Sequence, residues 1–503
     1  MTLDFSVNLH YFWALLPETI LCVCGLVVLL RGVREDASEA DGAGLAWLSL
    51  LGIALAAAAN GWLYGVTEVG HSSMVAVDGF RLFANWIFLA AAALSILISV
   101  AYVEKQRLQS AEFYALIIYS AVGMMLMGGS RDLILTFIAL EVMSIAIYVL
   151  AAINRRDRRS AESGLKYFLM GAFASGFFLY GIALVYGGTG TTNISGVAEV
   201  VRAGEDTAGL LLAGILLLTV GFGFKVAVVP FHMWTPDVYE GAPSPVTAYM
   251  SAAVKAAGFI AFFRVFYVAF GALHGQWQDA LWWLAAITMI AANIMALAQT
   301  NVKRMLAYSS IAHAGYLSVA LVALNETAAA GLLFYLLVYA FMNIGAFAVI
   351  IAASHHGEER LEVDDYAGFG WAQPTLGVAF TICLLSLAGF PGTGGFMGKV
   401  FLLLGAGDAG LWSLAVILVL TTIASYWYYL RVAWFMWMRN PLEGNTHGEV
   451  FAPLPLRVAL LACVGLILLT GFFPSVTLEL AQSSADSLTQ AAGSAGAVLG
   501  LGR

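Results

Sequence analysis

Charged residues are scarce in this sequence of 503 residues: they make up only 11% of it, whereas 61% is apolar and the mean hydropathy is +0.86. Soluble domains carry about 25% charged residues, so a water-soluble fold of this size could not cover its surface with so few charges. The composition therefore indicates a membrane protein and excludes nucleic-acid binding and ordinary cytosolic catalysis. The net charge of −8 points to no particular partner.

Cysteine is also rare, with only Cys22, Cys24, Cys383 and Cys463, each inside an apolar run. No histidine or second cysteine cluster stands near the first two to complete a metal site, so we expect buried, unreactive thiols. The sequence also lacks a ligand pattern for haem, flavin or iron–sulfur clusters, and it has no dinucleotide-binding glycine motif after a strand. We therefore expect no metal and no redox cofactor in this chain.

Long apolar runs recur along the whole chain. Since a spanning helix needs roughly 20 apolar residues, they predict an all-α polytopic membrane protein with about fourteen transmembrane helices. The predicted spans are residues 9–30, 44–66, 81–103, 112–129, 132–152, 163–187, 207–239, 244–270, 278–300, 304–323, 327–353, 374–406, 410–438 and 453–480. The tail after Ala481 is rich in Ala, Gly and Ser, and we expect it to lie loosely on the outer surface.

The basic residues predict the orientation of these spans. If the N-terminus is outside, the inner loops receive most of them, and the outer side keeps only Arg131, Arg202 and Arg503. The positive-inside rule expects this asymmetry when both termini are outside. Because the first apolar run follows no basic region, we interpret it as a membrane helix, which suits a bacterial inner membrane. The inner residues are Arg31, Arg34, Lys105, Arg107, Arg155, Arg156, Arg158, Arg159, Lys303, Arg304, Arg360 and Arg439.

Two predicted spans are too long for one crossing and contain helix breakers. Residues 207–239 include Pro230, and residues 374–406 include the stretch Gly389-Phe-Pro-Gly-Thr-Gly-Gly. Proline interrupts a helix, and interrupted spans in corresponding halves point to inverted repeats with an ion path at the membrane midplane. The breaks are five spans apart, which predicts two inverted five-helix repeats with discontinuous helices 7 and 12. The predicted division is helices 1–3 in 1–111, the repeats in 112–270 and 278–438, and helix 14 with the outer tail in 453–503.

Four ionisable residues fall within the spans: Glu141, Lys225, Lys255 and Lys399. Each costs about 2.5–3.5 kcal/mol at a helix centre, so their retention by chance is implausible. One carboxylate cannot neutralise three lysines, and an amine between the opposing effects of burial and a nearby carboxylate can take up and release a proton. We therefore interpret the four residues as carriers of protons. The alternative is structural ion pairing or snorkelling to the interface, which suits Lys166, Arg264 and Arg431 near the helix ends.

Weaker candidates for a proton relay are His232, Tyr308 and His313. His313 lies in an apolar helix with hydroxyl groups one turn away, and histidine can relay protons near neutral pH. A buried histidine can equally be hydrogen-bonded in place without a relay role. Asp237 and Glu240 follow the broken helix, where we expect a solvated loop.

Three stretches carry a family resemblance. They are Pro230-Phe-His-Met-Trp-Thr-Pro-Asp and its continuation to Phe259, Gln299-Thr-Asn-Val-Lys303-Arg-Met-Leu-Ala-Tyr-Ser-Ser, and Phe390-Pro-Gly-Thr-Gly-Gly-Phe-Met-Gly-Lys399. They resemble the antiporter-like membrane subunits of respiratory complex I, and the short region after the last span favours the smaller type of these subunits. The resemblance runs through nearly the whole chain.

The resemblance implies a proton-translocating subunit of an NADH–quinone oxidoreductase. Glu141, Lys225, Lys255 and Lys399 match the family's ionisable positions in helices 5, 7, 8 and 12, and Lys166 and Lys303 match further polar positions of the central axis. NADH oxidation and quinone reduction would take place in partner subunits, which would hold FMN, the iron–sulfur clusters and the quinone. The expected partners are other membrane-arm subunits and the lipid bilayer.

Two other functions are compatible with the same features. One is a subunit of a multisubunit cation/proton antiporter, although residues 238–259 are typical of the respiratory type. The other is a structural subunit of the membrane arm that does not pump. A solute transporter is disfavoured because the spans offer few polar side chains that could shape a substrate site.

Overall fold

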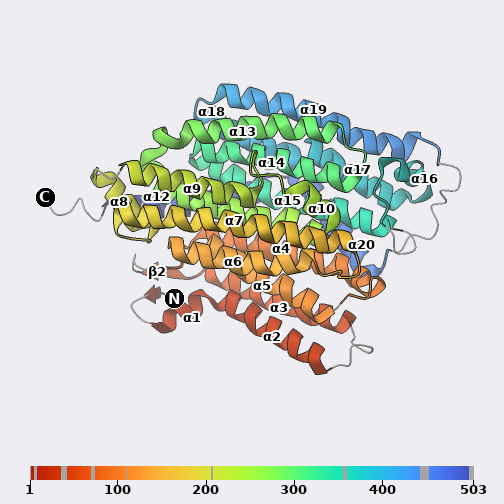
Figure 1. The fold of residues 1–503 in the computed structure, drawn as a ribbon, viewed down its shortest axis with the longest axis horizontal. Coiled ribbons are helices and arrows are strands. Elements are labelled where there is room, and N and C mark those ends of the chain that lie inside the picture. The colour runs from red at the N-terminus through yellow and green to blue at the C-terminus, as the bar shows by residue number, and fades with distance from the viewer. Residues whose placement is uncertain are drawn as a thin grey trace.

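A computed structural model describes residues 2–4, 8–34, 42–69, 74–108, 110–204, 208–354, 359–441 and 452–497. Long helices lie side by side in one bundle (Figure 1). Within the described residues, 13 helices are long and apolar enough to cross a membrane. A further apolar pair, α17 and α18, forms one interrupted crossing, so the prediction of an all-α protein with about fourteen spans is confirmed.

The helices follow the predicted apolar runs, with some runs divided. The first half of the chain contains α1 (Asn8–Ala14), α2 (Leu16–Arg34), α3 (Gly42–Leu63), α4 (Gly79–Lys105), α5 (Ser110–Gly128), α6 (Leu133–Ala151), α7 (Arg158–Thr189), α8 (Ile194–Ala203), α9 (Ala208–Val226), α10 (Thr235–Gly241), α11 (Ser244–Tyr249), the π-helix η1 (Met250–Val254) and α12 (Lys255–Ala269).

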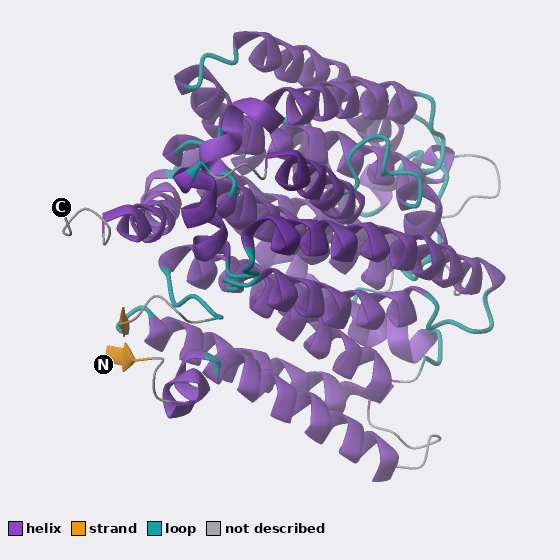
Figure 2. Ribbon diagram, turned by 60° about the vertical axis from the view of Figure 1, so that its left-hand side comes forward, coloured by secondary structure: helices purple, strands orange, loops and turns teal. Residues whose placement is uncertain are grey.

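The rest of the chain continues in the same way. It contains η2 (Gly271–Leu273), α13 (His274–Leu297), α14 (Val302–Ala323), α15 (Glu326–Ala353), η3 (Val363–Tyr366), α16 (Phe369–Ala372), α17 (Pro374–Ala388), α18 (Gly394–Asp408), α19 (Trp412–Met438), α20 (Leu454–Phe472) and α21 (Ser475–Ala497). Two three-residue strands, β1 (Thr2–Asp4) and β2 (Thr67–Val69), pair in parallel near the N-terminus (Figure 2). The apolar runs did not predict these strands.

Short polar side chains set where many of the helices begin. Lipid offers no hydrogen bonds, so the free N–H groups of a first turn need partners from the protein. Asp or Asn oxygen atoms accept these hydrogen bonds at six helix starts. The capping residues are Asp78, Asp132, Asp157, Asn193, Asn301 and Asn325.

Basic residues predicted for inner loops lie in the last turn of α2, in the connection between α6 and α7 and in the first turn of α7, which meet at one end of the bundle. We call this end the arginine-rich face and define it by Arg31, Arg34, Arg155, Arg156, Arg158 and Arg159. In Figure 1 the opposite end carries β2, α1 and α8. The arginine-rich face and the strand β1 therefore lie at opposite ends of the bundle.

The C-terminal region differs from the prediction. The predicted span 453–480 is wrong beyond Phe472, because α20 ends there and a new helix, α21, begins at Ser475 after Pro474. The expectation of a loose tail is also wrong for its described part. α21 packs against α4 and α15, and the hydroxyl of Ser487 accepts a hydrogen bond from the backbone N–H of Phe80 at 3.1 Å. Its buried residues include Ala481, Ser484, Ala485 and Leu488.

Cys22 is another correction. It is exposed on α2, whereas Cys24, Cys383 and Cys463 are buried, and all four are free. α2 packs on α3 and α5 and leaves its remaining surface uncovered, so one of two cysteines two residues apart points outward. The expectation of four buried thiols is therefore wrong for Cys22.

Arg264 does not snorkel, contrary to the prediction. Its side chain is only 2% exposed, and its guanidinium makes two hydrogen bonds of 2.7 Å to the Asp78 carboxylate and one of 2.8 Å to the carbonyl of Gly128. Burial alone would raise the pKa of Asp78, but the charge of Arg264 and its hydrogen bonds lower it to about 2. A second buried pair, Arg81 with Glu18 at 2.6 Å, joins α4 to α2.

We expect Asp78→Asn to destabilise the protein by about 3–5 kcal/mol, because it leaves a buried guanidinium without its counter-ion. Asp78 has a lower pKa in the folded state than its ordinary value of 3.8, so its stabilisation is present above that value and is lost as the pH falls toward 2. Thermal unfolding of the detergent-solubilised complex should therefore show a large difference between variant and wild type at neutral pH that shrinks in acid. Asp408→Asn, at an exposed carboxylate, should show no such difference. An unchanged melting temperature for Asp78→Asn would contradict the role of the pair.

Candidate functional site

Two interrupted helices position two of the central lysines, Lys225 and Lys399. α9 ends at Val226, directly after Lys225, and α10 begins at Thr235. α17 ends at Ala388 and α18 begins at Gly394, five residues before Lys399. The predicted breaks are therefore confirmed. Each break leaves backbone carbonyls that need partners, because lipid cannot supply them.

Lys399 meets that need at the end of α17. Its ammonium donates hydrogen bonds to the carbonyls of Leu387 at 3.2 Å and Ala388 at 2.9 Å, and it stands 4.8 Å from the ring centre of Tyr316. Gly389, which follows α17, has φ +87°, and a Cβ atom there would lie 3.0 Å from Cδ and 3.1 Å from Nζ of Lys399. Only glycine combines this conformation with room for the lysine.

Lys225 is held in the first break by neutral groups. Its ammonium donates to the hydroxyl of Ser144 at 2.7 Å and lies 5.6 Å from the ring centres of Tyr148 and Tyr167. Trp234, the last residue of the break, stacks on Tyr167 at 4.2 Å and donates from its indole nitrogen to the carbonyl of Phe224 at 3.0 Å. The chain thus folds back over the lysine.

Glu141 lies on α6, one turn before Ser144, and is half-buried. It accepts a hydrogen bond from Ser175 on α7. Ser175 and Lys225 line the same small cavity, and the carboxylate acts on the Lys225 ammonium electrostatically. The ion pairs among the described residues do not include one between Glu141 and Lys225. The two charges are therefore coupled without being locked together.

Lys255 begins α12 directly after the π-helix η1, an irregularity often found at functional sites. Its side chain is buried and donates to both the backbone carbonyl and the hydroxyl of Ser310 on α14. The hydroxyl of Tyr339 also donates to the hydroxyl oxygen of Ser310, at 2.9 Å.

One face of α14 connects Lys255 with Lys399. Ser310, His313 and Tyr316 follow one another at intervals of three residues, so they lie on one side of the helix over roughly 9 Å. His313 is buried between two hydroxyls, with Nδ1 at 2.7 Å from Tyr335 and Nε2 at 3.2 Å from Tyr429. Hydroxyls and an imidazole therefore fill the space between the two lysines.

The three central lysines share a property. Lys225, Lys255 and Lys399 are all buried, yet none of them pairs with a carboxylate among the described residues. Their partners are hydroxyls and backbone carbonyls. A neutral oxygen can bind either an ammonium or an amine, so no fixed negative charge holds the proton on these residues.

Lys303 lies at the beginning of α14, toward the arginine-rich face. Its ammonium donates to Glu359 at 2.9 Å and to the carbonyl of Ala242 at 2.8 Å. Glu359 also accepts from the hydroxyl of Tyr102 at 3.2 Å and from the backbone N–H of Ser244 at 3.3 Å. Burial alone would raise the pKa of Glu359, but Lys303 and these hydrogen bonds hold it below its ordinary value.

Lys166 belongs to a separate ion-pair network rather than to the central lysines. It contacts Asp237 at 2.8 Å and Glu162 at 2.8 Å, while Arg304 contacts Asp237 at 3.0 Å and Glu240 at 2.8 Å. The expectation of a solvated loop at Asp237 and Glu240 is wrong, because both lie in α10 and are ion-paired. A polar cavity of about 530 Å³, lined in part by Glu240, Lys303 and Glu359, lies beside this network.

The remaining relay candidates, His232 and Tyr308, are not hydrogen-bonded to the central lysines in the described part of the chain. His232 is half-buried in the first break, and Tyr308 lies on α14 near Arg304. In the part of the chain that the structure describes, no group of three or more His, Cys, Asp and Glu side chains is placed to hold a metal ion.

Several site residues were not found by sequence reasoning. Tyr335, Tyr339 and Tyr429 bind the α14 face, but tyrosines are common in apolar helices and carry no distinguishing spacing. Glu359 could have been noticed in the sequence, since it lies in the longest polar stretch of the chain, His355 to Asp365. Its pairing with Lys303, which the sequence already marked as a polar position, could not be predicted without the fold.

Comparison with known proteins identifies the family. Residues 130–425 match the family described as NADH:quinone oxidoreductase/Mrp antiporter, TM. NADH-quinone oxidoreductase subunit N of Trichlorobacter lovleyi is 48% identical over 482 residues, which cover 95% of this chain and 97% of that protein. Subunit N 1 of Solibacter usitatus is 42% identical over 475 residues, which cover 94% of this chain and 97% of that protein.

The solved structures agree with this placement. A chain of respiratory complex I from Thermus thermophilus with bound aureothin superposes with a TM-score of 0.78 at 37% identity, covering 93% of this chain and 99% of that one. A chain of the Mrp complex from Dietzia sp. has a TM-score of 0.80 but only 22% identity, covering 94% and 99%, and it shows a shared fold alone. This chain belongs to the NADH:quinone oxidoreductase/Mrp antiporter family, among the N subunits of NADH-quinone oxidoreductase.

Proposed function

We propose that this chain is a proton-translocating membrane subunit of NADH-quinone oxidoreductase, a translocase, and that Lys225, Lys255 and Lys399 carry the proton. The observation that carries the proposal is the set of three buried amines whose hydrogen bonds go only to neutral oxygen atoms. Lys255 and Lys399 also meet one face of α14. The names of the relatives support the complex. Partner subunits would hold FMN, the iron–sulfur clusters and the quinone, and would carry out the redox chemistry.

Proton transfer would begin at Glu141 and Lys225. A change in the charge or position of Glu141 alters the electrostatic energy of the Lys225 ammonium, and through it the affinity of the lysine for its proton. Lys255 is close by in the fold, because a Cβ at Gly258, one turn further along α12, would lie 3.4 Å from Cγ of Lys225. Ser310, His313 and Tyr316 would then lead to Lys399.

The energy required is within reach of such a mechanism. Moving one charge against a membrane potential costs about 2.3 kcal/mol per 100 mV. A change of two units in the pKa of a carrier corresponds to about 2.7 kcal/mol. A modest change in the surroundings of a lysine can therefore offset the voltage.

The arginine-rich face would be the inner side of a bacterial inner membrane, by the positive-inside rule, with both termini outside. The polar cavity beside Lys303 and Glu359 would then open on the side from which protons are taken up. Lys399 would release them to the outer side. Residues 112–270 and 278–438 would form the two inverted repeats, with the breaks at corresponding positions in each.

A subunit of a cation/proton antiporter is the second candidate, and the fold shared with the Mrp chain favours it. Co-purification decides between them. An N subunit should purify with quinone-reducing subunits and lose proton pumping when they are inactive, whereas an antiporter subunit should exchange cations for protons without electron transfer.

We expect Lys225→Ala and Glu141→Gln each to lower proton pumping by at least about tenfold, the effect of some 1.4 kcal/mol, because each removes one member of the coupled pair. The measurement is pumping and NADH oxidation in inverted membrane vesicles. Arg457→Gln, at an exposed residue of α20, should pump normally. Full pumping at normal electron flux in both central variants would refute the assignment and leave a structural role.

Gly389→Ala should impair pumping by displacing Lys399 from the carbonyls of α17. The new Cβ would approach three side-chain atoms of that lysine within 3.3 Å. Gly410→Ala is the matched control, because Gly410 also has a positive φ of 70° but nothing lies within 4 Å of its Cβ position. Equal pumping by the two variants would show that the contact with Lys399 is unimportant.

A further inference from the structure

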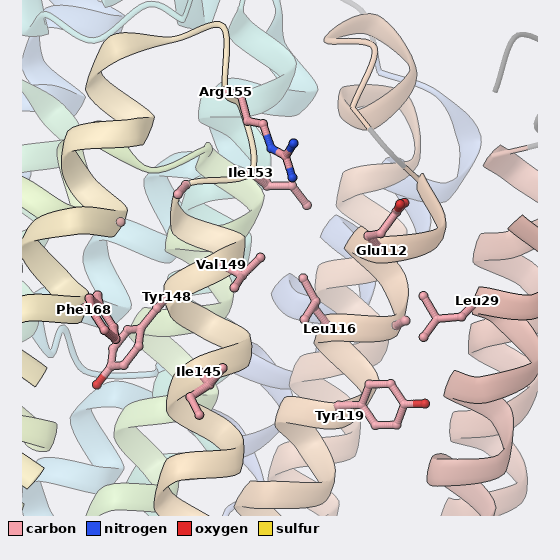
Figure 3. Close-up of a pocket in the computed structure, with 13 residues that line it drawn as sticks. Leu29, Glu112, Leu116, Tyr119, Ile145, Tyr148, Val149, Ile153, Arg155 and Phe168 are labelled. Atoms are coloured by element: carbon pink, nitrogen blue, oxygen red, sulfur yellow. The ribbon is translucent and has the colours of Figure 1, made fainter. Parts of the chain in front are cut away.

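A groove of about 670 Å³ opens on the side of the bundle, between α2 and α5 on one side and α6 and α7 on the other (Figure 3). Its walls are aliphatic and aromatic side chains, among them Leu29, Leu116, Ile145, Val149 and Phe168. Ile145, Val149 and Phe168 are 56%, 48% and 50% exposed. All of these helices are long and apolar enough to cross the membrane, so the groove lies on a membrane-embedded side of this chain.

The helical walls of the groove extend most of the way through one leaflet. From Glu112 to Tyr119 α5 covers seven residues, or about 10 Å, against about 15 Å for half of a hydrocarbon core. Figure 3 shows Arg155 and Glu112 at the mouth of the groove and Ile145 and Tyr119 farther in. An acyl chain entering from the arginine-rich side therefore fits along these walls.

Two opposite charges flank the mouth. The guanidinium of Arg155 points over the groove, and the carboxylate of Glu112 stands on the α5 side (Figure 3). Neither side chain forms an ion pair among the described residues. A cation and an anion on opposite sides of the mouth complement a headgroup with a phosphate and a primary ammonium, since the phosphate can bind the arginine and the ammonium the glutamate.

We propose that this groove is a binding site for one phospholipid with an ethanolamine headgroup, taken from the leaflet at the arginine-rich face. The acyl chain packs against Leu116, Val149 and Phe168, the phosphate binds Arg155 and the ammonium binds Glu112. The site does not depend on the proposed function. It is nevertheless next to the proton site, because Tyr148 lines the groove and its ring centre is 5.6 Å from the ammonium of Lys225.

The whole purified complex in mild detergent provides the test. It is exchanged in turn against phosphatidylethanolamine, phosphatidylglycerol and phosphatidylcholine, and the retained lipid is counted by native mass spectrometry. We expect the wild type to retain one more molecule of phosphatidylethanolamine than of phosphatidylcholine, which has no N–H donor. Arg155→Gln should reduce retention of this molecule at least tenfold, and Glu112→Gln should remove the preference for ethanolamine over choline.

Two further variants keep the test decisive if a charge change prevents assembly. Val149→Trp fills the groove without changing charge and should abolish the extra lipid, whereas Arg457→Gln on α20 should retain it. A photoreactive side chain at position 149 should form an adduct of the mass of phosphatidylethanolamine in native membranes. Capture of a neighbouring subunit instead would show that the groove is a protein interface, and equal lipid retention by all variants would equally overturn the proposal.

Discussion

In the interior of this protein, the ammonium of Lys399 and the free carbonyls at the end of α17 satisfy one another. Each is expensive alone, because lipid offers no hydrogen bonds to an open helix end and poorly tolerates a charge. The interruption and the lysine therefore depend on each other, and Gly389 provides the conformation that brings them together. A lysine also lies at the break after α9, but its partners differ: Lys225 is bound by a serine hydroxyl and two aromatic rings.

The buried cations of this fold divide into two kinds. Arg264 and Arg81 are bound to carboxylates at 2.7 Å and 2.6 Å, and arginine does not lose its proton in proteins, so these residues fasten helices together. Lys225, Lys255 and Lys399 have neutral oxygen partners and an amine that can exist in two states. The same apolar interior thus holds arginines paired with carboxylates and lysines bound by neutral oxygen atoms.

α14 links these features. Its first turn places Lys303 against Glu359 near the arginine-rich face, and its middle presents Ser310, His313 and Tyr316 to the lysines of two other helices. Nearly all of its residues are buried, so its polar groups must be satisfied internally. Tyrosines from α15 and α19 provide partners for Ser310 and His313, so this helix face carries a row of polar groups.

The sequence alone determined the membrane class, the spans, both helix breaks and the four central ionisable residues. These depend on local properties: the length of apolar runs, the position of proline and glycine, and the cost of a charge within an apolar run. Only the tertiary structure decided which groups those residues meet. Asp78 and Arg264 are 186 positions apart, and Ser310 and Lys255 are 55 apart, so no local pattern pairs them. The packing of α21 and the outward position of Cys22 were likewise decided by which neighbouring helices cover each face, which depends on the assembled bundle and not on any one segment.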